Sequence, residues 1–185
     1  MTEQQEKRLA LIPALAQGTS KHQIGRTALM KFMYFLQTLR GVPLGYRFTL
    51  YSYGPFDSTV LADLSVAESL RAVESRTVIY SGGYGYEITA GDKAKWLKKR
   101  AQKFVDQHEK DIRWVLQKFG TLTSSQLELV STIIYVDREA AEKNQTPRLK
   151  SLAGQVHEIK PHFSETEILG FAESLAKDKL LLAAH

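Results

Sequence analysis

The sequence predicts a mainly helical fold with a small β-sheet, of the α+β class. Apolar residues recur at spacings of three and four through most of the 185 residues, which is typical of amphipathic helices. Alternating runs of strand-forming residues are confined to the segment 46–89. Hydrophobic residues make up 43% and charged residues 24%, as in folded globular proteins, and the length suits one domain or two small ones.

Two helices are predicted before the first strand. Glu3–Gln17 is amphipathic and is closed by Gly18, so we expect it to act as an N-terminal brace. Thr27–Leu39 is apolar on almost every side, which is typical of a helix enclosed by other elements. Gly41 and Pro43 end this second helix, and it is predicted to be the central core helix.

A strand and two short helices are predicted next. Tyr46–Tyr53 alternates aromatic and polar residues and is predicted to be a strand. Phe56–Leu64 is predicted to form a helix capped by Asp57. The pair Ser65 and Glu68 has the spacing of a capping box, so a second helix is predicted through Val73.

Two further strands complete the first half. Thr77–Tyr80 and Tyr84–Thr89 are predicted to pair across a glycine turn at Ser81–Gly83. The resulting order is helix, strand, helix, helix, strand, turn, strand. This order predicts a winged-helix-like unit in residues 1–90.

The second half is predicted to be helical and to pack with the first in one globule. Residues 92–119 are predicted to form one amphipathic helix that links the halves. Later helices are predicted at Ser124–Glu142, from Thr146-Pro147 to Ile159, and from a capping box at Ser164 to Lys177. The tail Leu180–Leu182 is predicted to be a short extended segment, and a second helix-turn-helix unit in 91–185 stays open.

Three segments carry a family resemblance: Ala28–Gln37, the turn Gly41–Leu44, and Tyr51–Asp57 with its Tyr-Gly-Pro motif. Together they resemble the SocA-type, or Panacea, antitoxin domain over residues 24–90. The chain looks still more like the uncharacterised bacterial YwgA-like proteins, which also share a segment similar to Leu127–Tyr135. The resemblance implies a non-enzymatic protein that neutralises or binds a toxin-like partner. The Tyr-Gly-Pro motif also has a structural explanation, a tight turn between a strand and a helix.

No catalytic set is evident, so no enzyme, cofactor or metal site is predicted. The chain has no cysteine, which excludes disulfides and thiolate chemistry. His157 and His162 are five residues apart and Pro161 lies at the position where a zinc-binding helix motif needs its second histidine. Gly82, Gly83 and Gly85 are not followed by the Lys-Ser or Lys-Thr pair of a phosphate loop.

The positive charge is concentrated in one segment. Residues 92–119 hold nine Lys or Arg and four Asp or Glu, which accounts for the whole net charge of +5. An exposed, solvated helix face explains this pattern structurally. The alternative is a face for nucleic acid or an acidic partner, with the candidate residues Lys95, Lys99, Arg100 and Lys103. Trp96 and Phe104 are predicted to turn toward the core, which argues against base stacking there.

These observations predict a protein-interaction module, antitoxin-like or adaptor, that acts in the cytoplasm. Its candidate partner surface comprises Tyr51, Tyr53, Phe56, Arg71 and Tyr84. The alternative is a winged-helix DNA-binding regulator, although Ser65–Glu74, the expected recognition helix, is close to neutral and the wing Ser81–Tyr86 has no basic residue. No membrane span or export signal is predicted. A homo-oligomer stays open.

Overall fold

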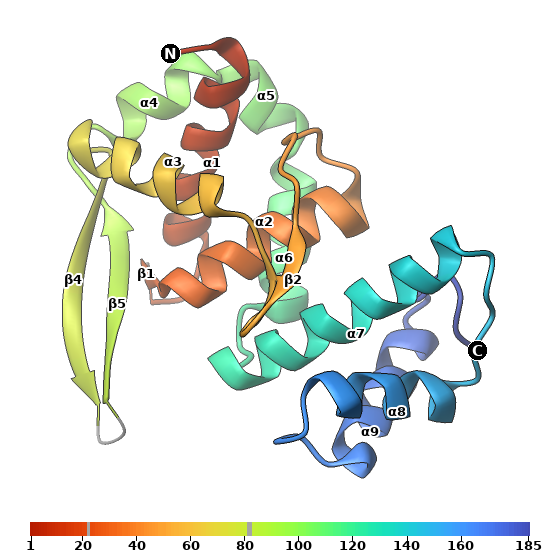
Figure 1. The fold of residues 1–185 in the computed structure, drawn as a ribbon. Helices are drawn as coiled ribbons and strands as arrows, with labels where there is room; N and C mark the ends of the chain where they lie inside the picture. Colours follow the sequence, from red (N-terminus) through yellow and green to blue (C-terminus); the bar gives the residue numbers. More distant parts are fainter. Residues whose placement is uncertain (22, 81–82) are drawn as a thin grey trace. The chain divides into compact units, whose positions relative to one another are not determined.

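A computed structural model describes residues 1–21, 23–80 and 83–185 (Figure 1). As predicted, the chain is mainly helical, with small antiparallel sheets. Its contacts group it into two compact units: a first unit of residues 1–49 and 56–122, and a second unit of residues 50–55 and 123–185. The segment 92–119 is thus grouped with the first unit, whereas the division drawn from the sequence at residue 90 placed it with the second half.

The two predicted N-terminal helices are confirmed. Helix α1 spans Glu3–Gly18. Thr2 caps its N-terminus, because its side chain accepts a hydrogen bond from the backbone N–H of Gln5. Helix α2 spans Arg26–Arg40, buries every residue from 29 to 36, and ends at Gly41 with a φ of 66°. Because α1 packs against α2–α6 and β5, it is a central element of this unit as well as a brace.

The predicted strand Tyr46–Tyr53 is too long. Only Thr49–Tyr51 forms strand β2, which pairs with β3, Gly54–Phe56. The backbone of Tyr46 is occupied elsewhere, because its N–H donates to the side chain of Gln37 and its carbonyl accepts from the same amide, both at 2.9 Å. These bonds tie the loop to α2 instead of to a strand.

The two predicted tandem helices are a single helix, α3, which spans Ser58–Ser69. Asp57 caps it as expected and accepts a hydrogen bond from the N–H of Thr59 at 2.8 Å. No glycine or proline interrupts this helix. Ser65 lies inside it and does not cap a new helix; its carbonyl accepts a hydrogen bond from the hydroxyl of Ser69. The winged-helix order was predicted from the tandem pair, so the structure does not confirm it.

A long hairpin follows α3. Strand β4, Val73–Tyr80, begins four residues earlier than predicted and pairs antiparallel with β5, Gly83–Ala90. Strand β1, Gln23–Ile24, was not predicted; it pairs with Ile88 and Thr89 and gives the sheet order β1-β5-β4. Ser81 and Gly82 of the predicted turn lie outside the described residues.

The predicted single helix over residues 92–119 is three helices. They are α4 (Ala94–Arg100), α5 (Gln102–Gln107) and α6 (Glu109–Phe119). The backbone departs from helical angles at Ala101 and His108, where φ is −116° and −105°. A straight helix of this length would span about 42 Å, whereas the breaks let all three pieces pack against α1.

Three helices form the second unit. Helix α7 spans Ser124–Glu142 and starts with a capping box between Thr123 and Gln126. Helix α8 spans Leu149–Ile159 and begins two residues after Pro147, where its first turn was predicted. Helix α9 spans Glu165–Lys177, with Ser164 as its N-cap. No helix in the described ranges is long and apolar enough to cross a membrane.

Candidate functional site: the β4–β5 hairpin

One face of the hairpin carries apolar residues from its base toward its tip, with Ser75 and Thr77 of β4 between them. At the base, Val73 and Ile88 are buried in the core. Further out, Tyr86 is half-buried and the guanidinium of Arg26 lies 3.5 Å from the centre of its ring. Ile79 and Tyr84 face each other across the strands and are 88% and 71% exposed. Figure 1 shows both strands extending beyond the helices at their base. The apolar stripe therefore continues past the core that would cover it.

A polar hollow lies beside the base of this stripe. It measures about 510 Å³ and is lined by Arg26, Glu68, Val73, Glu74, Ser75, Thr77 and Tyr86. Three buried atoms among these residues have no hydrogen-bond partner in the described part of the chain: Nε of Arg26, Oε1 of Glu68 and Oγ of Ser75. Buried polar atoms are rarely left unpaired, and these three lie below the surface of the hollow, next to β4.

Strand β4 is also the open edge of its sheet. In the order β1-β5-β4, its outer side has no strand beside it among the described residues. Strand β1 covers β5 only opposite Ile88 and Thr89. The outward N–H and C=O groups of an edge strand can pair with another extended backbone.

The predicted partner-surface residues do not gather on one unit. Tyr51 and Tyr53 belong to the second unit and are 66% and 70% exposed. Phe56, Arg71 and Tyr84 belong to the first unit. Phe56 is half-buried and Arg71 forms an ion pair with Asp92 at 2.6 Å, so of these three Tyr84 is the exposed apolar one. Ile79 was missed, because the strand was predicted to be too short to show its alternation.

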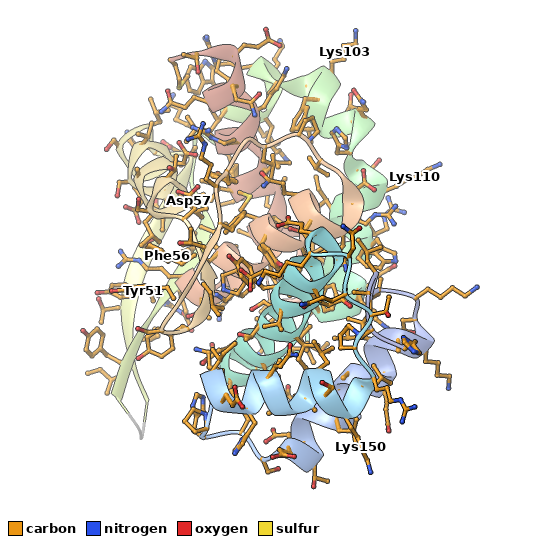
Figure 2. All side chains as sticks on the ribbon, turned by 45° about the vertical axis from the view of Figure 1, so that its right-hand side comes forward. Tyr51, Phe56, Asp57, Lys103, Lys110 and Lys150 are labelled. Atoms are coloured by element: carbon orange, nitrogen blue, oxygen red, sulfur yellow. The ribbon has the colours of Figure 1, made fainter. Side chains whose placement is uncertain are left out.

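The predicted basic residues are exposed, as Figure 2 shows for Lys103, whose side chain points away from the ribbon. Lys95 and Lys99 are exposed too, while Arg100 donates through Nε to Glu6 at 3.0 Å. Phe104 is buried as predicted, but the prediction for Trp96 is wrong, since this side chain is 45% exposed. The break at Ala101 separates the two aromatic residues onto different helices, so one apolar stripe does not hold both.

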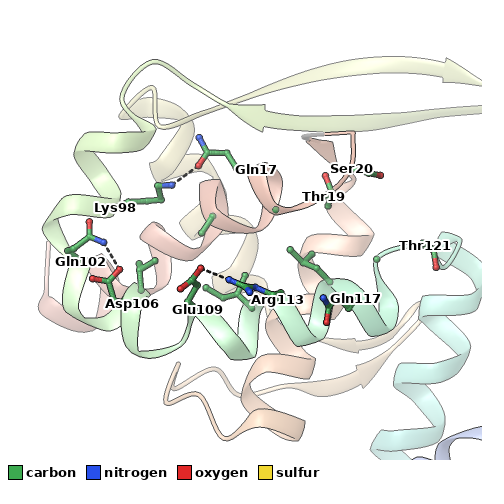
Figure 3. Close-up of a pocket in the computed structure, with 16 residues that line it drawn as sticks. Gln17, Thr19, Ser20, Lys98, Gln102, Asp106, Glu109, Arg113, Gln117 and Thr121 are labelled. Carbon is green, nitrogen blue, oxygen red and sulfur yellow. Dashed lines mark hydrogen bonds and ion pairs between the residues drawn. The ribbon is translucent and has the colours of Figure 1, made fainter.

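A groove between the end of α1 and helices α4–α6 measures about 680 Å³ (Figure 3). Its apolar lining includes Val105, Ile112 and Leu116. Its charged groups are paired with one another or with amides: Lys98 with Gln17 at 2.6 Å, Gln102 with Asp106 at 2.6 Å, and Arg113 with Glu109 at 2.7 Å. Because these polar side chains already bind one another, they are not available to bind a polar ligand.

The Tyr-Gly-Pro motif packs against α7 within the second unit. Gly54 has a φ of +83°, and a Cβ there would lie 2.9 Å from the hydroxyl of Thr132 and 3.0 Å from that of Ser131. The ammonium of Lys160 donates to the carbonyl of Ser52 and lies 2.8 Å from Oε1 of Glu128. The motif therefore has a structural role, because it anchors residues 50–55.

The two histidines near Lys160 hold no metal-like arrangement. Nδ1 of His157 lies 2.7 Å from the carbonyl of Phe163, and Nε2 of His162 lies 3.5 Å from Oε1 of Glu128. Across residues 1–21, 23–80 and 83–185, no group of three or more His, Cys, Asp or Glu side chains could hold a metal ion.

A buried polar cluster in the first unit is structural as well. The hydroxyl of Tyr46 donates to Oδ2 of Asp63 at 3.0 Å, and Nε of Arg8 lies 2.7 Å from the same oxygen. Burial, together with the charge of Asp63, raises the pKa of Tyr46. The cluster joins α1, the loop before β2, and α3.

No family model matches the chain, and no curated protein matches its sequence. The resemblance to SocA/Panacea domains and YwgA-like proteins therefore stays a prediction. The geometry of the hairpin and of the basic segment is the remaining guide to function.

Proposed function

We propose that this chain is a non-enzymatic protein-interaction module that binds an extended segment of a partner protein along β4 and the outer hairpin. The observation that carries the proposal is the exposure of Ile79 and Tyr84, at 88% and 71%, at the end of a stripe that begins in the core. Burying a large apolar side chain contributes about 1.5–3 kcal/mol. A partner that covers this pair would gain that free energy.

The open edge of β4 favours strand addition as the mode of binding. A partner strand would pair its backbone with the outer N–H and C=O groups of β4, and alternate side chains would contact the stripe. The side chains of Arg26, Glu68 and Ser75 line the hollow beside β4, so polar groups of that strand would lie next to them. Backbone pairing would supply affinity, and the stripe and hollow would supply specificity.

An antitoxin-like or adaptor role is the form of this function that the resemblance implies. The elements α1, β1, α2, α3, β4 and β5, with sheet order β1-β5-β4, also fit the order of a winged helix, in an assignment different from the one predicted from the sequence. In that assignment the hairpin is the wing. We propose that this wing binds protein.

A winged-helix DNA-binding regulator is the alternative. Major-groove recognition relies on Arg, Lys, Asn or Gln on the inserted helix. Helix α3, the recognition helix in this assignment, contains none of these residues. Duplex DNA therefore ranks below a protein partner.

The test compares three versions of the full chain, each tagged and purified from the organism of origin. The versions are wild type, a double variant Ile79→Ser with Tyr84→Ser, and the control Leu182→Ser, which changes an apolar residue that is 70% exposed. We expect one protein to be recovered with wild type and control but lost at least tenfold with the double variant.

Two outcomes would overturn the proposal. Equal recovery with all three versions would place binding elsewhere. Recovery of the chain alone, with sedimentation showing self-association that the double variant abolishes, would make a second copy the occupant. Circular dichroism of the double variant checks that it folds, which is expected because both changed side chains are exposed.

A further inference from the structure

Five residues of α4 and α5 form a second surface, which we call the α4 face: Lys95, Trp96, Lys99, Arg100 and Lys103. Lys95 and Lys99 are four residues apart on α4, as are Trp96 and Arg100, so each pair lies on one side of the helix. All five are exposed. The guanidinium of Arg100 lies over the ring of Trp96, 5.5 Å from its centre.

The lysines of this face are available to a ligand. Lys95, Lys99 and Lys103 have no ion-pair partner within residues 1–21, 23–80 and 83–185, whereas nearby acidic groups are engaged. Glu3 pairs with Lys7 at 2.6 Å, and Glu6 pairs with Arg100. A hollow of about 540 Å³ is lined by Lys99, Arg100 and Lys103 with these two acids and Lys7.

We propose that the α4 face binds single-stranded nucleic acid, with Trp96 as a platform for base stacking and the three lysines as phosphate contacts. Stacking of a base on an aromatic side chain is tolerant of sequence, because every base has a π-face. In a duplex those faces are hidden, so an exposed tryptophan among lysines suits a single strand better. This activity is independent of the hairpin and its partner.

An anionic lipid surface is the competing ligand for a face of Lys and Trp. Stable attachment of a helix to a membrane needs a broad apolar face. On α4, Trp96 is the exposed large apolar side chain, and Leu97 is buried. The geometry therefore favours nucleic acid, and lipid becomes an outcome of the test.

The test is a titration of the full chain with oligo(dT)20 and with a duplex of the same length. Its variants are Trp96→Ala and a triple change of Lys95, Lys99 and Lys103 to Glu. The charge-matched control changes the exposed residues Lys110, Lys143 and Lys150 to Glu. Fluorescence anisotropy of a labelled oligonucleotide follows binding, and circular dichroism checks folding.

We expect wild type and control to bind the single strand more tightly than the duplex. Trp96→Ala should weaken binding about tenfold, as expected for the loss of one stacked base. The triple variant should lose binding by a larger factor and lower the salt dependence, which for three phosphate contacts on a single strand has a log–log slope of about −2.

Three results would overturn the proposal. The first is equal affinity for wild type and Trp96→Ala. The second is equal loss in the triple variant and in its charge-matched control, which would show a general charge effect. The third is absence of oligonucleotide binding together with binding to vesicles that contain phosphatidylserine, which would assign the face to lipid.

Discussion

The carboxylate of Asp137 accepts a hydrogen bond from the backbone N–H of Ala183 at 3.0 Å, although 46 residues separate them. The N–H groups of Leu182 and Ala184 donate to the same carboxylate at 2.7 and 2.9 Å. Asp137 is fully buried on α7. The C-terminal tail, predicted to be a short extended segment, forms no strand; besides Asp137, Arg138 binds it by donating to the carbonyl of Leu180 at 3.0 Å.

Asp137→Asn should therefore destabilise the second unit. The amide is neutral and its NH2 group cannot accept, so all three N–H groups lose a charged acceptor, at least one loses its acceptor altogether, and Arg138 loses its ion pair. Hydrogen bonds to charged groups contribute about 1.5–3 kcal/mol each, and we expect a loss of at least about 1.5 kcal/mol. Urea unfolding followed by far-ultraviolet circular dichroism measures it. Asp106→Asn, an exposed change, should shift stability by less than about 0.5 kcal/mol.

Gly54→Ala should destabilise the second unit, unlike a glycine-to-alanine change within a helix. Its φ of +83° is unfavourable for alanine, and the added Cβ would lie 2.9 Å from Thr132. We expect a loss above about 1 kcal/mol. Gly154→Ala on α8 is the matched control, since its added Cβ meets nothing within 4 Å apart from its chain neighbours and the backbone of its own helix. That change should stabilise the chain by about 0.5–1 kcal/mol. Equal effects of both changes would contradict this account.

The buried pair of Lys160 and Glu128 should show strong coupling. Both residues are less than 10% exposed. Removing one partner leaves an unpaired buried charge, which costs about 3–5 kcal/mol. Lys160→Met and Glu128→Leu should each be strongly destabilising, whereas the double variant should cost much less than their sum. A double-mutant cycle in urea measures the difference, and simple additivity would show that the pair is not coupled.

Acid should destabilise the first unit partly through Asp57. Burial raises the pKa of this carboxyl, but hydrogen bonds from the backbone of Arg47 and Thr59 outweigh it and hold the pKa below its usual value. A lowered pKa stabilises the fold above the unfolded value of about 3.9, and that stability is lost as pH falls through the folded pKa. Asp57→Asn should thus be less stable at neutral pH and lose less stability between about pH 5 and pH 2. An unchanged slope against pH would contradict this.

The parts of the fold that could be predicted are those set by residues close together in the sequence. The start of α7 at Ser124 and the cap of α9 at Ser164 depend on contacts within one helical turn, and both helices begin where they were predicted to begin. The strand at Tyr46 failed because its backbone bonds to Gln37, a contact that no local pattern reveals. The tandem helices failed because a capping-box spacing at Ser65 also occurs inside a continuous helix.

The candidate sites depended on longer-range geometry. Tyr84 was predicted from the strand pattern, but the exposure of Ile79 depends on how far the hairpin extends past the core. Trp96 lies next to an apolar position, and its exposure became visible only with the break at Ala101. Residue type and spacing therefore indicated candidate segments, whereas tertiary packing decides which of their side chains are exposed.

Site-specific photo-cross-linking in living cells tests the central claim most directly. A photoreactive amino acid is placed at position 79 in one version and at position 182 in another, since both side chains are well exposed. The account predicts a cross-link to one distinct protein from position 79 and none to that protein from position 182. Cross-links to that protein from position 182 alone, or from position 79 only to a second copy of the chain, would contradict it.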